Sequence, residues 1–199
     1  MADFILAGAQ TVQIYVDPAD TNYKGIRIAA EAFAGDVELV TGKKPELVDS
    51  EAQLTGPAIV VGTMAQNPLI ATAAEAGSLN LSEIDGKWEC YVTKLNDNVI
   101  YIVGSDKRGC IYGIYRLSEM IGVSPWVWFA DVAPEKKEEL KFTAEELDCV
   151  SKEPSVKYRG IFINDESPSF TGWVYGKFGG LNDKMYCHVF ELILRLKGN

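Results

Sequence analysis

Three consecutive polar residues, Asn164, Asp165 and Glu166, follow a short apolar run and are the first candidates for chemistry. The run at residues 161–163, within the segment 157–165, is typical of a strand buried on both faces in a parallel sheet. In a barrel of alternating strands and helices, the active site forms at the carboxyl ends of the strands. Two carboxylates and an amide at such a place suit a polyhydroxylated ligand. The alternative is that Asp165 and Glu166 only cap the following loop or bind a neighbouring lysine, and the sequence leaves both interpretations open.

The loop expected at residues 166–181 carries aromatic side chains that suit a sugar ring. Trp173, Tyr175 and Phe178 lie in it among glycines. Aromatic faces pack well against apolar C–H surfaces, and long irregular loops often serve function. We therefore include Trp173 among the candidate substrate-binding residues. The alternative is that these aromatic residues form a small core of the loop itself.

Glycoside hydrolysis needs a carboxylic acid and a second carboxylate on opposite sides of the scissile bond. The residues around Asp165 supply at most one of this pair. Arg159 precedes Asn164 by five residues, which places it about 16 Å away along a strand. We therefore expect Arg159 to be structural, and no complete catalytic set lies within the 199 residues.

The turn at residues 104–109, from Gly104 to Gly109, follows an apolar strand and opens a helix. That order is typical of phosphate-binding turns at helix N-termini. However, the turn lacks the GxGxxG and GK[ST] patterns, and Asp106 would repel an anion. We favour a capped helix with a glycine that allows close packing. The alternative function is a small module that binds a phosphate-bearing ligand or a protein partner through this turn.

Composition and charge argue against a nucleic-acid-binding or membrane-spanning protein. The 199 residues are 47% hydrophobic and 24% charged, with a formal net charge of −9. This balance is typical of a soluble globular protein, and the scattered positive residues argue against binding to nucleic acid. No apolar run approaches the length of a membrane span. The first ten residues lack the basic region of a signal peptide, so we expect a cytoplasmic protein, or a secreted or periplasmic one if a leader has been removed.

Metals and cofactors are not expected from the sequence. The cysteines form no CxxC pair and are expected to be free, buried thiols, and His188 is the only histidine. A zinc site needs about four ligands at short spacings. The cysteines are Cys90, Cys110, Cys149 and Cys187.

Hydrophobic periodicity predicts an α/β fold with a mixed, sandwich-like sheet in residues 1–150. The apolar segment 58–63 reads as a strand covered by helices on both faces, and residues 88–104 read as a hairpin. A polar stretch at residues 148–154 marks the domain boundary. Residues 151–199 then supply one strand, a long loop and one helix. The expected strands lie at residues 13–17, 45–49, 58–63, 88–95, 99–104, 125–132 and 157–165, and the helices begin near residues 20, 68, 105 and 182.

Two stretches carry a resemblance to a known family. They are KRGCIYGIYRLSEMIGVSPWVWFADVAP at residues 107–134, and SVKYRGIFINDESPS with FGGLNDKMYCHVFELILRLKGN in the last 45 residues. Together they resemble glycoside hydrolase family 115, the xylan α-1,2-glucuronidases. The resemblance implies an amino-terminal α/β accessory domain and the first strand and helix of a (β/α)8 catalytic barrel.

The resemblance also implies an inverting hydrolase that removes glucuronic acid, or its 4-O-methyl ether, from glucuronoxylan or its oligosaccharides. Asn164 and Asp165 match the strand-end pair that lines the glucuronate pocket in that family. The family's general acid and the residues that grip the uronate carboxylate lie on later barrel strands. We therefore expect this 199-residue chain to be inactive alone. The apolar surface of the incomplete barrel should fold back on the chain, swap, or pair with a second copy to form a homo-oligomer.

Overall fold

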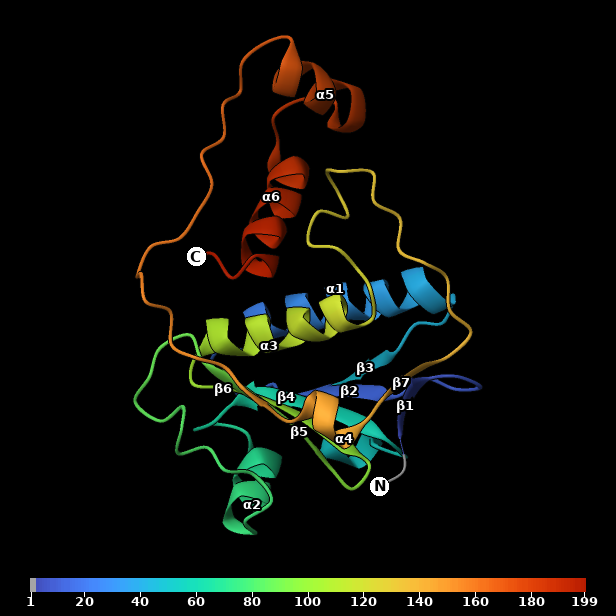
Figure 1. Cartoon of the computed structure of the whole chain (residues 1–199), viewed down its shortest axis with the longest axis vertical. Helices are drawn as coiled ribbons and strands as arrows, with labels where there is room; N and C mark the ends of the chain where they lie inside the picture. The colour runs from blue at the N-terminus through green and yellow to red at the C-terminus, as the bar shows by residue number, and fades with distance from the viewer. Residues whose placement is uncertain (1–2) are drawn as a thin grey trace.

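The structure is a computed structural model that describes residues 3–199 (Figure 1). Strands and helices alternate along the first 150 residues, and two helices follow. The strands are β1 (Phe4–Ala7), β2 (Gln13–Val16), β3 (Glu46–Val48), β4 (Ala58–Thr63), β5 (Tyr91–Asn96), β6 (Val99–Gly104), β7 (Leu140–Phe142) and β8 (Cys149–Val150). The helices are α1 (Tyr23–Thr41), α2 (Pro68–Glu75), α3 (Lys107–Met120), α4 (Ala144–Leu147), α5 (Ser169–Phe178) and α6 (Asp183–Arg195), with a 3-10 turn at Glu51–Gln53.

A six-stranded mixed sheet forms the centre of the molecule, in the order β3-β2-β4-β6-β5-β8. Strands β3, β2, β4 and β6 are parallel, whereas β5 runs antiparallel to both β6 and β8. Strands β5 and β6 are joined by a hairpin turn in which Asp97 has a φ of 52°. The predicted mixed α/β fold is therefore confirmed, and so is the hairpin.

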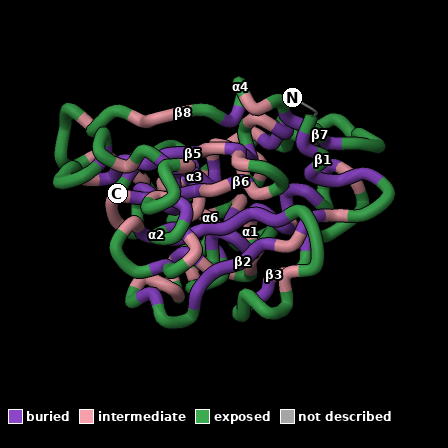
Figure 2. Tube along the Cα trace, turned by 90° about the horizontal axis from the view of Figure 1, so that it is seen from below, coloured by how far each residue is buried: buried purple, intermediate pink, exposed green. Residues whose placement is uncertain are grey.

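Helices cover both faces of this sheet. All six residues of β4 are buried, because α1 and α3 pack on one face and α2 lies on the other (Figure 1). Figure 2 shows the buried strands surrounded by exposed loops. The small antiparallel pair of β1 and β7 adds to the core on the α1 side, where Phe4 and Phe142 are 5% exposed.

Local sequence signals begin and end the long helices. Asn67 and Asp106 precede α2 and α3, and their side-chain oxygens accept hydrogen bonds from first-turn amides. Such caps satisfy amides that have no partner within the helix. Helix α1 ends at Gly42, whose φ of 75° is the left-handed conformation that glycine adopts without steric cost.

Two sequence predictions for local structure were wrong, and a third, the strand at residues 157–165, is not confirmed. Residues 125–132 form turns and not an aromatic strand, and residues 166–181 contain helix α5 within the expected loop. Residues 157–165 are not assigned to a strand. A strand exists only when its backbone pairs with a neighbour, and this segment pairs with no other strand in the described part of the chain.

Helix α6 stands on the outer side of the α1 and α3 layer, and α5 lies beyond it (Figure 1). A small separate core joins α5 and α6 through Val174, Met185 and Val189, all 3% exposed or less. Asn182 caps α6, as expected, by accepting a bond from the Met185 amide at 3.1 Å. None of the helices in residues 3–199 combines the length and the apolarity needed to cross a bilayer.

Candidate functional site

The polar triplet Asn164, Asp165 and Glu166 lies exposed just before α5. Its backbone begins that helix: the Asp165 carbonyl accepts a bond from the Thr171 hydroxyl, and the Glu166 carbonyl accepts one from the Ser169 hydroxyl at 3.3 Å. Across the described residues 3–199, the two carboxylates make no side-chain hydrogen bond and no ion pair. Both side chains are therefore free to meet a ligand, although their roles as site residues stay predictions.

An apolar hollow of about 400 Å³ opens beside Asn164. Phe162 is 92% exposed, whereas Val189 and Leu192 of α6 are buried. An exposed apolar surface of this kind commonly marks a place where another part of a protein packs. The hollow is lined by Trp126, Phe129, Ile161, Phe162, Ile163, Asn164, Phe170, Val189 and Leu192.

Trp173 lies in the middle of an aromatic cluster. Its ring centroid lies 5.5 Å from that of Phe129, 5.9 Å from that of Phe170 and 5.7 Å from that of Phe178. The Lys177 ammonium lies 5.1 Å from the same ring. These contacts agree with the alternative of a small core for Trp173 and Phe178, whereas Tyr175 is 60% exposed. Sugar binding by Trp173 stays a prediction.

Glu89 is the centre of a buried cluster of charged side chains, which the sequence alone did not predict. Its side chain is 3% exposed and pairs with Arg159 and, at 3.4 Å, with Arg108. Its carboxylate also accepts a bond from the Asn199 side-chain amide at 3.0 Å. The Arg159 guanidinium lies 3.3 Å from the Tyr112 hydroxyl, and burial, together with the charge of Glu89, raises the pKa of Tyr112 to about 12. Arg159 is thus structural, as the sequence predicted.

Arg195 is the centre of a second buried cluster. Its guanidinium is 2% exposed and pairs with Asp36 of α1 at 2.8 Å and with Glu191 at 2.7 Å. The same group lies 4.6 Å from the ring centroid of Tyr115 on α3. Burial raises the pKa of the Asp36 carboxyl, while Arg195 acts in the opposite direction.

A sequence signal for this pair existed. Asp36 lies among the apolar positions of α1, between Phe33 and Val37, and Arg195 lies three residues after Leu192 on the apolar side of α6. Opposite charges on the core-facing stripes of two helices indicate a buried ion pair, since an isolated buried charge is very costly.

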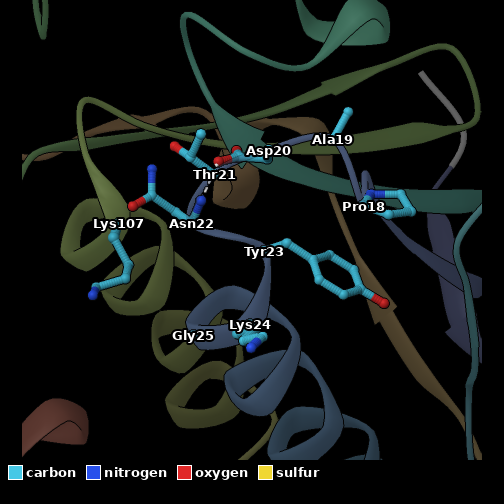
Figure 3. A pocket seen from close by; sticks show the side chains of 9 residues that line it. All are labelled: Pro18, Ala19, Asp20, Thr21, Asn22, Tyr23, Lys24, Gly25 and Lys107. Carbon is cyan, nitrogen blue, oxygen red and sulfur yellow. Dashed lines mark hydrogen bonds between the residues drawn. The ribbon is translucent and has the colours of Figure 1, made fainter.

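A second hollow, of about 490 Å³, lies where the β2–α1 loop meets Lys107 at the start of α3 (Figure 3). It sits beyond the carboxyl end of β2, a common place for ligands in open α/β sheets. However, the buried Asp20 carboxylate is fully used by the backbone amides of Asn22 at 2.8 Å and Thr63 at 3.0 Å and by the Thr63 hydroxyl at 2.9 Å. Asp20 therefore has a structural role, because its hydrogen bonds join the β2–α1 loop to the end of β4.

The turn at residues 104–109 is a packing junction. The Asp106 carboxylate accepts bonds from the Gly109 and Glu89 amides, each at 2.8 Å. A Cβ on Gly109 would lie 2.0 Å from the Cys90 carbonyl oxygen, and one on Gly104 would lie 2.2 Å from the Cys110 amide. The glycines thus allow strand and helix to approach closely, and a carboxylate occupies the place that a phosphate would need.

Thiols and acidic residues do not gather into a metal site in the part of the chain that the structure describes. All four cysteines are free, as predicted, but the prediction that they are buried is wrong for Cys187, which is exposed. Burial raises the pKa of the Cys90 and Cys110 thiols, so these two are inert neutral side chains at ordinary pH.

A family profile and one solved structure point to the same family. The sequence profile of glycosyl hydrolase family 115 matches residues 151–199. A solved structure, the family GH115 4-O-methyl-α-glucuronidase BtGH115A with specificity for decorated arabinogalactans, is 31% identical over 99% of this chain, with a TM-score of 0.82. The structure of CpGH84B covers 99% of this chain at 18% identity and a TM-score of 0.47, which is too low to carry an argument. No curated protein matches the chain.

The chain spans about a quarter of the solved glucuronidase, covering 25% of its length. The likeness extends over 99% of the present chain. It therefore includes both the six-stranded sheet with its helices in the first 150 residues, called the mixed-sheet domain below, and the segment with Asn164. The profile match at residues 151–199 is an independent indication of the same family. We conclude that the chain belongs to glycoside hydrolase family 115.

Proposed function

We propose that these residues form part of a hydrolase that removes glucuronic acid, or its 4-O-methyl ether, from xylan. The observation that carries this proposal is the 31% identity and TM-score of 0.82 to a 4-O-methyl-α-glucuronidase over 99% of the chain. That relative has specificity for decorated arabinogalactans, so decorated arabinogalactan is the alternative polysaccharide for this chain.

In this proposal, residues 1–150 are an accessory domain, and residues 151–199 are the first strand and helix of a (β/α)8 barrel. The exposed Phe162 and the apolar hollow beside it support this assignment, because a barrel strand is covered by neighbouring strands and helices. Asn164 and Asp165 would then lie at the carboxyl end of the first barrel strand, where barrel active sites form.

The proposed reaction is an inverting hydrolysis. It needs a general acid that protonates the leaving oxygen and a general base that activates water, with the two carboxyl groups about 6.5–9.5 Å apart. Asp165 and Glu166 are adjacent, and successive side chains on an extended segment point to opposite sides. The 199 residues therefore offer one carboxylate to the site, and the chain by itself is proposed to be inactive.

A titration separates this proposal from the alternative of a phosphate-binding module. We would follow backbone and side-chain amide signals of the chain by NMR while adding glucuronic acid in one series and a nucleotide in another. The proposal predicts no shift at residues 104–109 with the nucleotide, because the Asp106 carboxylate already accepts bonds from two amides of this region. Saturable nucleotide shifts in that turn would overturn the proposal in favour of the alternative. Any glucuronate shifts are expected at Asn164 and Asp165.

A further inference from the structure

The segment with the candidate site is tied to the mixed-sheet domain by two buried charged clusters. Arg159 reaches Glu89, and Arg195 reaches Asp36. Both acidic side chains are almost inaccessible, with 3% of Glu89 and 5% of Asp36 exposed. A buried carboxylate is tolerated only when it is paired, so each of these residues needs its arginine.

Glu89 holds both ends of the segment at one point. The backbone amide of Asn199 donates to the Arg159 carbonyl at 2.8 Å, and the Arg159 amide donates to the Asn199 side chain at 3.1 Å. The Arg159 side chain also donates to the Lys197 carbonyl at 2.8 Å. Because Arg159 and Asn199 both contact the Glu89 carboxylate, the beginning and the end of the unit from 159 to 199 are fixed together.

The backbone at Glu89 is itself unusual. Its φ is 53°, a left-handed conformation that is uncommon for residues other than glycine. Such a conformation persists where the surroundings fix it, and it occurs often at sites that hold other groups in place. The Glu89 amide donates to Asp106 at 2.8 Å, so the loop that presents the carboxylate is anchored on α3.

The second cluster fixes the rotation of α6. The Arg195 guanidinium bridges Asp36 through two contacts, at 2.8 and 2.9 Å, and Glu191 through two more, at 2.7 and 2.8 Å. It also stacks near Tyr115. A planar fork with partners on α1, α3 and α6 permits one orientation, which a lysine ammonium would not reproduce.

We infer that Asp36 and Glu89 are positioning residues, through which the mixed-sheet domain sets the place of the strand end that carries Asn164. The inference rests on the proposed function for its meaning in catalysis. Arg159 lies five residues before Asn164, so the two are about 16 Å apart on an extended chain. A small change of angle at Glu89 therefore moves the candidate site.

The test is amide hydrogen exchange of the full chain and of the variants Glu89→Gln and Arg195→Lys. We expect exchange in α6 to become about 10-fold to 100-fold faster, while exchange in β4 stays within about twofold of the original chain. The side-chain amide signal of Asn164 should shift in both variants. Arg27→Met is the matched control, because Arg27 forms ion pairs on the surface of α1 and should change neither α6 nor Asn164.

Equal acceleration in β4 and α6, including complete loss of the fold, would overturn the inference, because it would mean that the clusters only support global stability. Unchanged α6 exchange or an unmoved Asn164 signal would overturn it as well. These readouts do not use hydrolysis, so a failure of the proposed glucuronidase activity would leave them intact. Conversely, a mobile α6 would not bear on the activity.

Discussion

Replacing Gly109 by alanine decides whether the turn at residues 104–109 is a packing junction or a ligand site. The new Cβ would lie 2.0 Å from the Cys90 carbonyl oxygen, whereas real Cβ atoms essentially never approach within 3.0 Å. Helix α3 and β5 must therefore separate by about 1 Å or more, and overpacking of this kind costs about 1–3 kcal/mol. Strain in the cap bond from Gly109 to Asp106 adds up to about 1 kcal/mol. The expected loss in the free energy of unfolding is about 1–4 kcal/mol.

The assay is urea unfolding followed by circular dichroism. Gly35→Ala is the control, since nothing lies within 4 Å of a Cβ at Gly35 on α1, and alanine in a helix interior should stabilise by about 0.5–1 kcal/mol. A Gly109→Ala protein with unchanged stability would refute the packing argument. If that variant also lost affinity for a phosphate ligand, the turn would have to be assigned to binding.

Three further perturbations test other parts of the structure. Arg195→Met should lower the free energy of unfolding by about 3–5 kcal/mol, because it leaves the buried Asp36 carboxylate unpaired. Asp36→Asn should cost less, because Arg195 keeps Glu191 as a partner, and the double variant should lose less than the sum of the two in urea unfolding. The pKa of Tyr112 is about 12 in the folded chain and near 10 when unfolded. Its contribution to stability is therefore present below pH 10 and is lost as the pH rises toward 12. Tyr112→Phe should make the fall in melting temperature over this pH range shallower. Phe162→Ser should change the free energy of unfolding by less than about 0.5 kcal/mol, because the side chain is 92% exposed, yet reduce self-association in sedimentation velocity.

Each of these expectations has a contrary outcome. Strictly additive losses in the double variant would mean that Asp36 and Arg195 do not interact. An unchanged alkaline profile in Tyr112→Phe would mean that this hydroxyl ionises as easily in the folded chain as in the unfolded one. Identical monomeric sedimentation with and without Phe162 would remove the predicted self-association.

The spacing of apolar residues predicted most strands and helices of the mixed-sheet domain, because burial decides which positions of these elements are apolar. The unbroken apolar run of β4 and the stripe of α1 follow from the sheet being covered on both faces. The close packing of a glycine in the turn at residues 104–109 also follows from the place of this turn between a strand and a helix. By contrast, β1 and β7 are short, and their pairing joins residues far apart in sequence, which local patterns do not reveal.

The tail was harder to predict for physical reasons. Residues 157–165 have the composition of a buried strand, but strand formation depends on a partner that the described residues do not supply. Glycines at 172 and 176 suggested an irregular loop, yet contacts of Trp173 and Val174 stabilise helix α5. The buried role of Arg195 depends on Asp36, 159 positions away, so a single helix pattern does not show it.

Hydrolysis of a glucuronoside by the isolated chain can be measured in solution. The 199-residue protein would be incubated with 4-O-methylglucuronoxylan oligosaccharides and with decorated arabinogalactan oligosaccharides, and released uronic acid would be followed by proton NMR. We expect the oligosaccharides to stay intact, because Asn164 and Asp165 have no opposing acid or base within these residues. Release of glucuronic acid by the chain alone, abolished by Asp165→Asn, would contradict it.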